Sequence, residues 1–139
     1  MTEVIDMKTA RITTAGVATL AGVVVLQLAS AQQLGIQRSE VLRNDLSVPG
    51  REVIQVLVDF AAGASFPRHS HPGEEVAYVM EGKLEYRLDG RAPVILEAGD
   101  ALFIPAGAVH SVTNLGGGNG SELATYIVQK GEPLFVLAP

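Results

Sequence analysis

Only three histidines occur in the chain, and two of them, His69 and His71, are separated by a single residue. On a β-strand this spacing points both imidazoles to one face, so that their nitrogens can converge on one ion. An acidic residue follows at Glu75, with Glu74 beside it as an alternative, and His110 comes from a distant segment. Three neutral imidazoles and one carboxylate suit a divalent transition metal and leave coordination positions for water or substrate.

The segments that must position these residues have the character of short strands. In residues 52–59, Ile54, Val56 and Val58 occupy alternate positions, which is the period of a half-buried strand. Further candidates, parted by glycine- and proline-containing turns, are 75–81, 83–88, 93–100, 101–105, 110–114, 122–129 and 133–138. Beyond a short apolar segment near the N-terminus, no helical periodicity is sustained. Strands at this spacing predict an all-β fold, either a sandwich, a barrel or a jelly roll.

The candidate ligands fall into two blocks that resemble the two signature motifs of the cupin family. The first motif, G-x5-H-x-H-x3,4-E-x6-G, is matched by Gly63, His69, His71, Glu75 and Gly82. The second, G-x5-P-x-G-x2-H-x3-N, is matched by Gly99, Pro105, Gly107, His110 and Asn114. The interval to Gly82 selects Glu75 as the acid of the motif, because Glu74 would lengthen it by one residue.

The resemblance implies a double-stranded β-helix, that is a jelly-roll barrel, over roughly residues 36–139. It also implies one divalent transition-metal ion inside the barrel, bound by His69, His71, Glu75 and His110. Fe, Mn, Ni, Cu and Zn all suit this ligand set, and availability rather than sequence decides among them. Asn114 is expected to be a turn or network residue and not a ligand.

Small cupins commonly pair by exchanging N-terminal strands, so the resemblance further implies a homodimer with residues 36–47 as the exchanged segment. On β-strand parity, Ala77 and Val79 should line the interior with Glu75, which leaves room beside the metal. Arg68 and Ser70 alternate with the histidines and should face away from it.

Family members with a complete ligand set include ring-cleaving dioxygenases, oxalate-degrading enzymes and metal-dependent isomerases. We therefore expect a metal-dependent oxidoreductase, dioxygenase-like, that acts on a small organic molecule, with Glu75 as a catalytic residue able to move a proton. No histidine or inward carboxylate outside the ligand set is expected as a separate base, although Tyr78, Tyr86 or Tyr126 could enter the pocket. The alternative is a non-catalytic protein that binds a metal or a metal-bound small ligand.

A different signal marks the N-terminus. Residues 15–28 carry no charge, Lys8 and Arg11 precede them, and an A-x-A-like site follows at 29–31. This arrangement predicts a secretory signal peptide over residues 1–31. A retained membrane anchor is the alternative, but fourteen helical residues rise about 21 Å, short of the roughly 30 Å hydrocarbon core. A buried core helix is the other alternative.

The expected mature domain, residues 32–139, would be periplasmic or secreted and free of the membrane after cleavage. Translation from Met7 would remove two acidic residues that are unusual before a signal sequence. The chain has 139 residues, 47% of them hydrophobic, and a formal net charge of −5. This balance lacks the positive footprint of a nucleic-acid binder. The absence of cysteine excludes disulfides, thiolate metal sites and cysteine nucleophiles.

Overall fold

A computed structural model of the protein describes residues 35–139. The signal peptide predicted over residues 1–31 and the alternative start at Met7 lie outside the described residues. Within residues 35–139, the structure contains no helix with the length and apolar character needed to cross a membrane.

The described residues form strands joined by turns, without a helix, so the all-β prediction is confirmed. In chain order the strands are β1 (Ile36–Asp45), β2 (Arg51–Phe60), β3 (Ser65–Ser70), β4 (Gly73–Glu81), β5 (Lys83–Leu88), β6 (Val94–Glu97), β7 (Ala101–Ile104), β8 (His110–Asn114), β9 (Gly120–Gln129) and β10 (Val136–Leu137).

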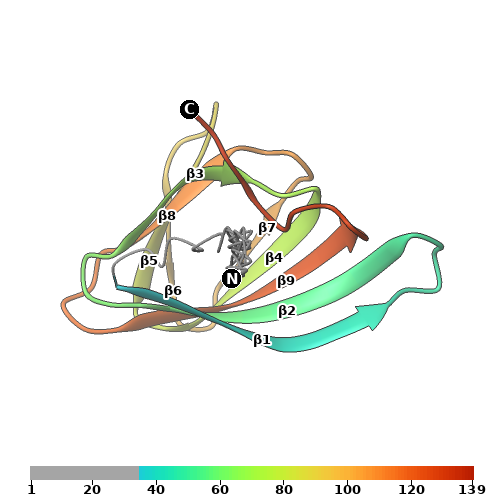
Figure 1. The fold of residues 1–139 in the computed structure, drawn as a ribbon. Coiled ribbons are helices and arrows are strands. Elements are labelled where there is room, and N and C mark those ends of the chain that lie inside the picture. Colours follow the sequence, from blue (N-terminus) through green and yellow to red (C-terminus); the bar gives the residue numbers. More distant parts are fainter. Residues whose placement is uncertain (1–34) are drawn as a thin grey trace, which may run out of the picture.

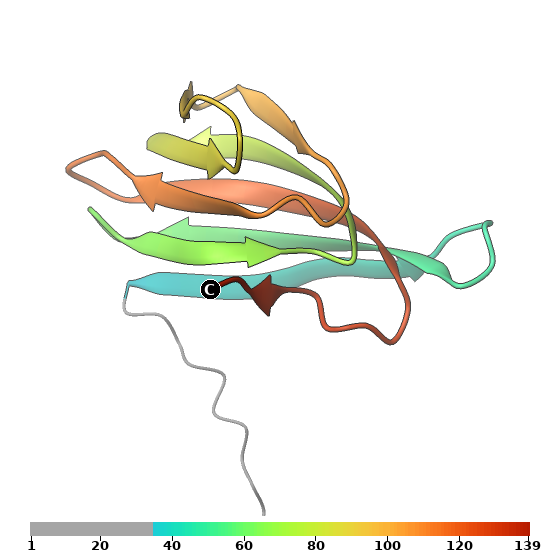
Figure 2. The same cartoon turned by 90° about the horizontal axis from the view of Figure 1, so that it is seen from above.

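The strands form two antiparallel sheets that face each other across a common interior (Figures 1 and 2). One sheet has the order β1-β2-β9-β4-β7, and the other has the order β10-β3-β8-β5-β6. Apart from the pairs β1–β2 and β5–β6, each pairing joins strands that are distant in the sequence. Each sheet therefore contains both early and late segments of the chain. This topology is what brings the two sequence motifs to one place.

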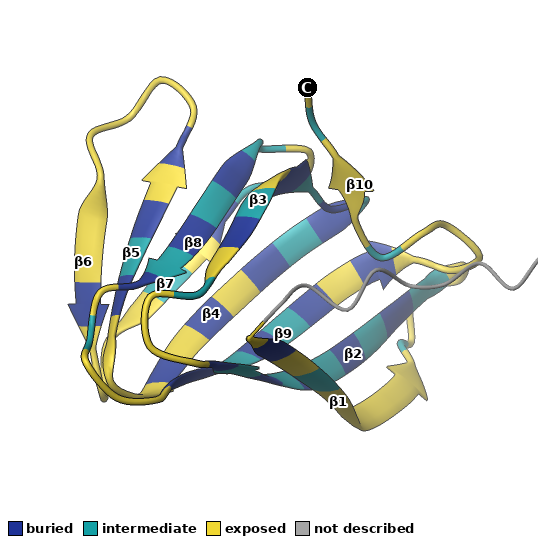
Figure 3. Cartoon of the chain, turned by 60° about the vertical axis from the view of Figure 1, so that its left-hand side comes forward, coloured by how far each residue is buried: buried dark blue, intermediate teal, exposed yellow. Residues whose placement is uncertain are grey.

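Alternation decides which side chains face the interior, as the banding of β2, β4 and β9 shows in Figure 3. On β4, Glu75, Ala77 and Val79 are 3%, 0% and 0% exposed, so the predicted parity is confirmed. The paired strand β9 contributes Ala124 opposite Ala77, and both are fully buried. Both belong to the hydrophobic core, and neither lines the pocket described below.

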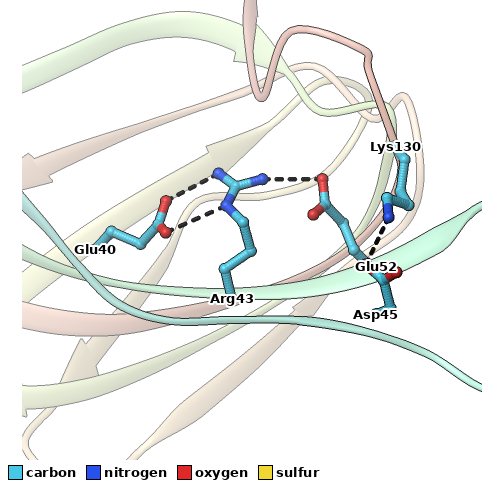
Figure 4. Close-up of polar contacts among 5 residues, drawn as sticks. All are labelled: Glu40, Arg43, Asp45, Glu52 and Lys130. Atoms are coloured by element: carbon cyan, nitrogen blue, oxygen red, sulfur yellow. Dashed lines mark hydrogen bonds and ion pairs between the residues drawn. The ribbon is translucent and has the colours of Figure 1, made fainter.

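Strand β1 differs from the others because only Ile36 among its ten residues is buried. It lies at the edge of its sheet and pairs with β2 of its own chain, with a bulge between Glu40 and Leu42. In the second half of β1, Arg43 forms ion pairs with Glu40 of the same strand and with Glu52 of β2, as Figure 4 shows. Exchange of residues 36–47 between two chains remains a prediction.

The turn between β4 and β5 depends on Gly82, one of the motif glycines. Its φ is +83°, a left-handed conformation that side chains rarely adopt. A Cβ atom built there would also lie 2.8 Å from the carbonyl oxygen of Asn119. Both conformation and space therefore require glycine at the point where β4 leaves the sheet.

Candidate metal centre

The four sequence-predicted ligands come together from both sheets. His69 belongs to β3, His110 begins β8, and Glu75 belongs to β4 in the opposite sheet. His71 lies one residue past the end of β3, not within a strand as the spacing suggested, because Pro72 interrupts the ladder and turns the chain toward β4. All four side chains are buried. We refer to these four residues as the histidine–glutamate cluster.

One nitrogen from each histidine of the cluster lies within 4.8 Å of the corresponding nitrogens of the other two. The Nδ1 atoms are engaged elsewhere: they lie 2.7, 2.6 and 3.0 Å from backbone carbonyl oxygens of Pro67, Leu134 and Ala108, for His69, His71 and His110 respectively. Because a carbonyl oxygen only accepts, each Nδ1 must donate its proton. The Nε2 lone pairs of the neutral rings are then free to act as ligands.

The carboxylate of Glu75 completes the cluster. Its Oε2 atom is 3.0 Å from Nε2 of His71 and 3.3 Å from Nε2 of His110. Among the described residues, Oε2 of Glu75 and Nε2 of His71 are buried without a hydrogen-bond partner. With Nδ1 protonated, the two atoms are acceptors that face each other, which is unfavourable unless a cation lies between them. The residues present therefore fit a divalent metal ion.

The electrostatics of the cluster favour a positive charge at the same point. Burial alone would raise the pKa of Glu75, but the His110 and His71 rings outweigh this effect and lower that pKa. Burial alone would lower the pKa of His110, but the Glu75 carboxylate raises it. Burial, followed by the proximity of His110, lowers the pKa of His69 to about 3, so His69 remains neutral. A carboxylate that draws a proton onto imidazole also draws a metal ion, which displaces that proton.

Glu74 and Arg68, which are close to the cluster in sequence, form ion pairs outside it. Glu74 faces outward on β4 and forms an ion pair of 2.8 Å with Arg51, so Glu75 is the acid that reaches the interior. Arg68 is exposed and pairs with Asp89 at 2.6 Å, as its predicted outward direction requires.

Asn114 is a network residue, as expected. Its amide donates to the carbonyl oxygens of Phe60, Ala61 and Gly118 over 2.9–3.1 Å, and its Oδ1 accepts from the amide of Gly116. It thereby ties the end of β2 to the glycine-rich loop, residues 115–119, between β8 and β9.

A narrow pocket extends from the cluster along the interior of the barrel. The lining residues are Arg38, Val58, Phe60, Phe66, His69, Glu75, Tyr86, His110, Val112, Glu122 and Tyr126. All of these except Arg38 are buried, and Arg38 is half-buried. The pocket therefore reaches solvent beside Arg38.

One functional group in this pocket was not predicted from the sequence. Glu122 is an inward carboxylate outside the ligand set, 4% exposed, so the expectation that none exists is wrong. Tyr86 donates a hydrogen bond to its Oε2 atom. Burial and the negative charge of Glu75 raise the pKa of Glu122 to about 8. Parity could have revealed it, since Glu122 alternates along β9 with the buried Ala124 and Tyr126.

Of the three tyrosines that could enter the pocket, two do so. Tyr86 and Tyr126 line it and are 1% and 2% exposed, whereas Tyr78 points outward from β4 and is 45% exposed. Burial raises the pKa of both inner tyrosines above the ordinary range, so their hydroxyls stay protonated. Neither is an anionic base in the metal-free protein, and because Tyr86 donates its one hydroxyl proton to Glu122, Tyr126 is the one that can donate to a bound molecule.

Comparison with known proteins agrees with this geometry. Residues 56–126 match the family model described as the cupin domain. Among curated proteins, dimethylsulfoniopropionate lyase DddQ from Ruegeria pomeroyi is 36% identical over 55 residues. That match covers 40% of this chain and 27% of the relative, so the chain spans about a quarter of that protein.

Solved structures give the same fold. A protein with a double-stranded β-helix domain from Klebsiella pneumoniae has a TM-score of 0.63 and 24% identity, covering 76% of this chain and 85% of that one. Oxalate oxidase in complex with glycolate has a TM-score of 0.62 and 26% identity. The latter alignment covers 78% of this chain but 57% of the oxidase. The expected double-stranded β-helix is therefore confirmed.

Proposed function

Because this chain belongs to the cupin family, we propose that it is a metal-dependent oxidoreductase, of the dioxygenase type, that acts on a small organic molecule. The active site would be the pocket that begins at the histidine–glutamate cluster. The observation that favours catalysis over metal binding alone is Glu122, a second carboxylate in the same pocket that the cluster does not use. A protein that only binds a metal has no need of such a buried acid, which is costly to fold.

The side chains of the pocket would have distinct tasks. His69, His71, Glu75 and His110 would hold a divalent ion, whose chemistry when bound is to polarise an oxygen-bearing substrate. Glu122, with its pKa raised to about 8, holds a proton near neutral pH and can pass it to or receive it from a bound molecule. The Tyr86 hydroxyl fixes the orientation of that carboxyl group. In this arrangement Glu122, and not Glu75, moves the proton.

Two likenesses suggest what kind of reaction to test. Oxalate oxidase, 26% identical over the aligned region, supports an oxidation of a small organic acid. A second candidate is a metal-dependent lyase that uses no oxidant. It is favoured by the match to dimethylsulfoniopropionate lyase DddQ together with Glu122, which offers the acid or base that an elimination needs.

Oxygen uptake and product formation can test these candidates on one panel. The metal in purified protein would be identified first, and the protein then assayed with flavonols, catechols, diketones, oxalate and dimethylsulfoniopropionate. Oxygen consumption on one compound supports the oxidoreductase, and cleavage without oxygen supports the lyase. Glu122→Gln should lower kcat by about 100-fold or more with metal content unchanged. Glu132→Gln, which changes an exposed carboxylate, is the matched control. Full metal retention with no turnover would instead support a binding protein.

We also propose that the mature protein is exported and dimeric. Export is supported by the sequence of residues 1–31. Dimerisation is supported by β1, an edge strand with exposed Val41 and Leu42 that leaves one side open to a second chain. A monomeric mass in light scattering would contradict the dimer.

A further inference from the structure

Arg38 occupies the mouth of the pocket, and its position follows from strand register. It lies opposite Val58 on β2, and Val58 lies opposite Glu122 on β9. Directly paired residues share a face of the sheet, so Arg38 points to the same interior as Glu122, two strands away. Its side chain is half-buried and lines the pocket where the other lining residues are fully buried.

Arg38 forms no salt bridge within the described part of the chain, although its charge acts to lower the pKa of the nearby Glu122 carboxyl group. Arg43, five residues further along the same strand, shows the contrast, since it bonds to both Glu40 and Glu52 (Figure 4). Arg38 instead makes one long hydrogen bond of 3.5 Å, to the hydroxyl of Tyr126. A guanidinium carries five N–H donors, so most of its hydrogen-bonding capacity is unused.

Aromatic rings hold this guanidinium in place beside the cluster. It lies over the rings of Phe66 and Phe135, at 5.4 and 4.9 Å from the ring centres, distances typical of cation–π contacts. The Phe66 ring in turn meets the His69 ring edge-on at 4.6 Å. A single aromatic ring thus separates Arg38 from His69 of the histidine–glutamate cluster, and all three side chains line the pocket.

We propose that Arg38 is the anchor for a carboxylate group, and that the pocket takes small organic acids whose second oxygen function points toward the histidine–glutamate cluster. The inference rests on the proposed function, since it assumes that the cluster binds a metal. A planar guanidinium forms paired hydrogen bonds to a carboxylate, which a point charge does not. The charges around the pocket also favour an anionic ligand. A bound divalent ion would more than balance the charge of Glu75, Glu122 holds a proton, and Arg38 adds a further positive charge at the entrance.

Matched pairs of charged and neutral ligands test this anchor. Mn(II)-loaded protein would be titrated with glycolate and with glycolamide, and with 3-hydroxypropionate and its amide, by calorimetry. Each pair has the same shape and differs in the carboxylate. We expect at least one acid to bind about 10- to 100-fold more tightly than its amide, the range of charge-assisted hydrogen bonds. Arg38→Gln should remove this preference while the affinity for the amide stays within about twofold.

Arg43→Gln is the matched control, because it removes an arginine from the same strand outside the pocket, and it should keep the wild-type preference. Two results would overturn the anchor: unchanged binding of the acid by Arg38→Gln, or the absence of any acid preference in the wild-type protein. Manganese content, measured on every sample, separates the two proposals. Protein that binds no metal contradicts the proposed function, whereas metal-loaded protein whose acid preference ignores Arg38 contradicts the anchor alone.

Discussion

The hydroxyl of Tyr86 donates a hydrogen bond to the carboxyl group of Glu122 across the interior of the barrel. The two residues belong to different sheets, since Tyr86 is on β5 and Glu122 on β9. The bond is therefore a polar link between sheets whose other contacts are mainly apolar. It also holds an ionisable group away from water, which makes folding sensitive to the protonation of Glu122.

We predict that the Glu122→Gln variant is less sensitive to rising pH than the wild-type protein. Below about pH 4.5 the carboxyl group is protonated both in the folded and in the unfolded chain and contributes nothing. Between pH 4.5 and about 8 the unfolded chain releases the proton, while the folded chain retains it because burial raises the pKa of Glu122 to about 8. Stability contributed by this proton is thus lost as pH rises, by an amount on the order of 3–5 kcal/mol.

Urea unfolding at pH 5 and pH 8, in the presence of a chelator, measures this difference. The variant should gain stability relative to wild type at the higher pH. Glu132→Gln, at an exposed position, should follow wild type at both values. Parallel pH profiles for Glu122→Gln and wild type would show that Glu122 ionises normally inside the barrel.

Replacement of His69 or His110 by alanine should abolish stoichiometric metal binding. Each change removes one Nε2 ligand from a cluster whose remaining acceptors cannot compensate. Elemental analysis should fall from about one ion per chain to a trace. Glu74→Gln changes an outward carboxylate beside the cluster and should keep the metal. Full metal content in both histidine variants would refute the ligand assignment.

Asn114→Ala should destabilise the fold without removing the metal. The substitution leaves three buried or partly buried backbone carbonyls and one amide without their side-chain partner. We expect a loss of about 2–4 kcal/mol in the free energy of unfolding, measured in urea. Ser111→Ala on the same strand should cost less than about 1 kcal/mol. Loss of metal in a folded Asn114→Ala protein would instead indicate a direct role at the site.

The exported form should begin near Gln32. A signal peptide over residues 1–31 would be removed during export, and intact mass measurement of the periplasmic or secreted protein would show the new N-terminus. A product that retains residues 7–31 and sediments with membranes would favour a membrane anchor.

The sequence pattern predicts the parts of this protein in which each residue's role is local. Alternation identifies β2 and the inward face of β4, and motif spacing identifies the four residues of the cluster. Strand β1 escapes such reasoning, because an exposed edge strand has no alternating apolar residues. Arg38 escapes for a related reason: its place at the pocket is set by pairing with β2, not by its neighbours in sequence. The alternation along β9 could have identified Glu122 as an inward-facing residue, but acidic residues are ordinarily not expected in a protein core.

The hydrogen bond from Nδ1 of His71 to the carbonyl oxygen of Leu134 gives the end of the chain an unexpected duty. Leu137, three residues later, pairs in register with the backbone of His69, so this segment contacts one imidazole directly and the strand that carries a second. Residues 134–137 thus fasten β3 and the His71 ring at this edge of the sheet. A deletion that begins at Leu134 would remove the acceptor of the His71 Nδ1 proton, so we expect slower amide exchange in this segment when the centre binds a metal ion.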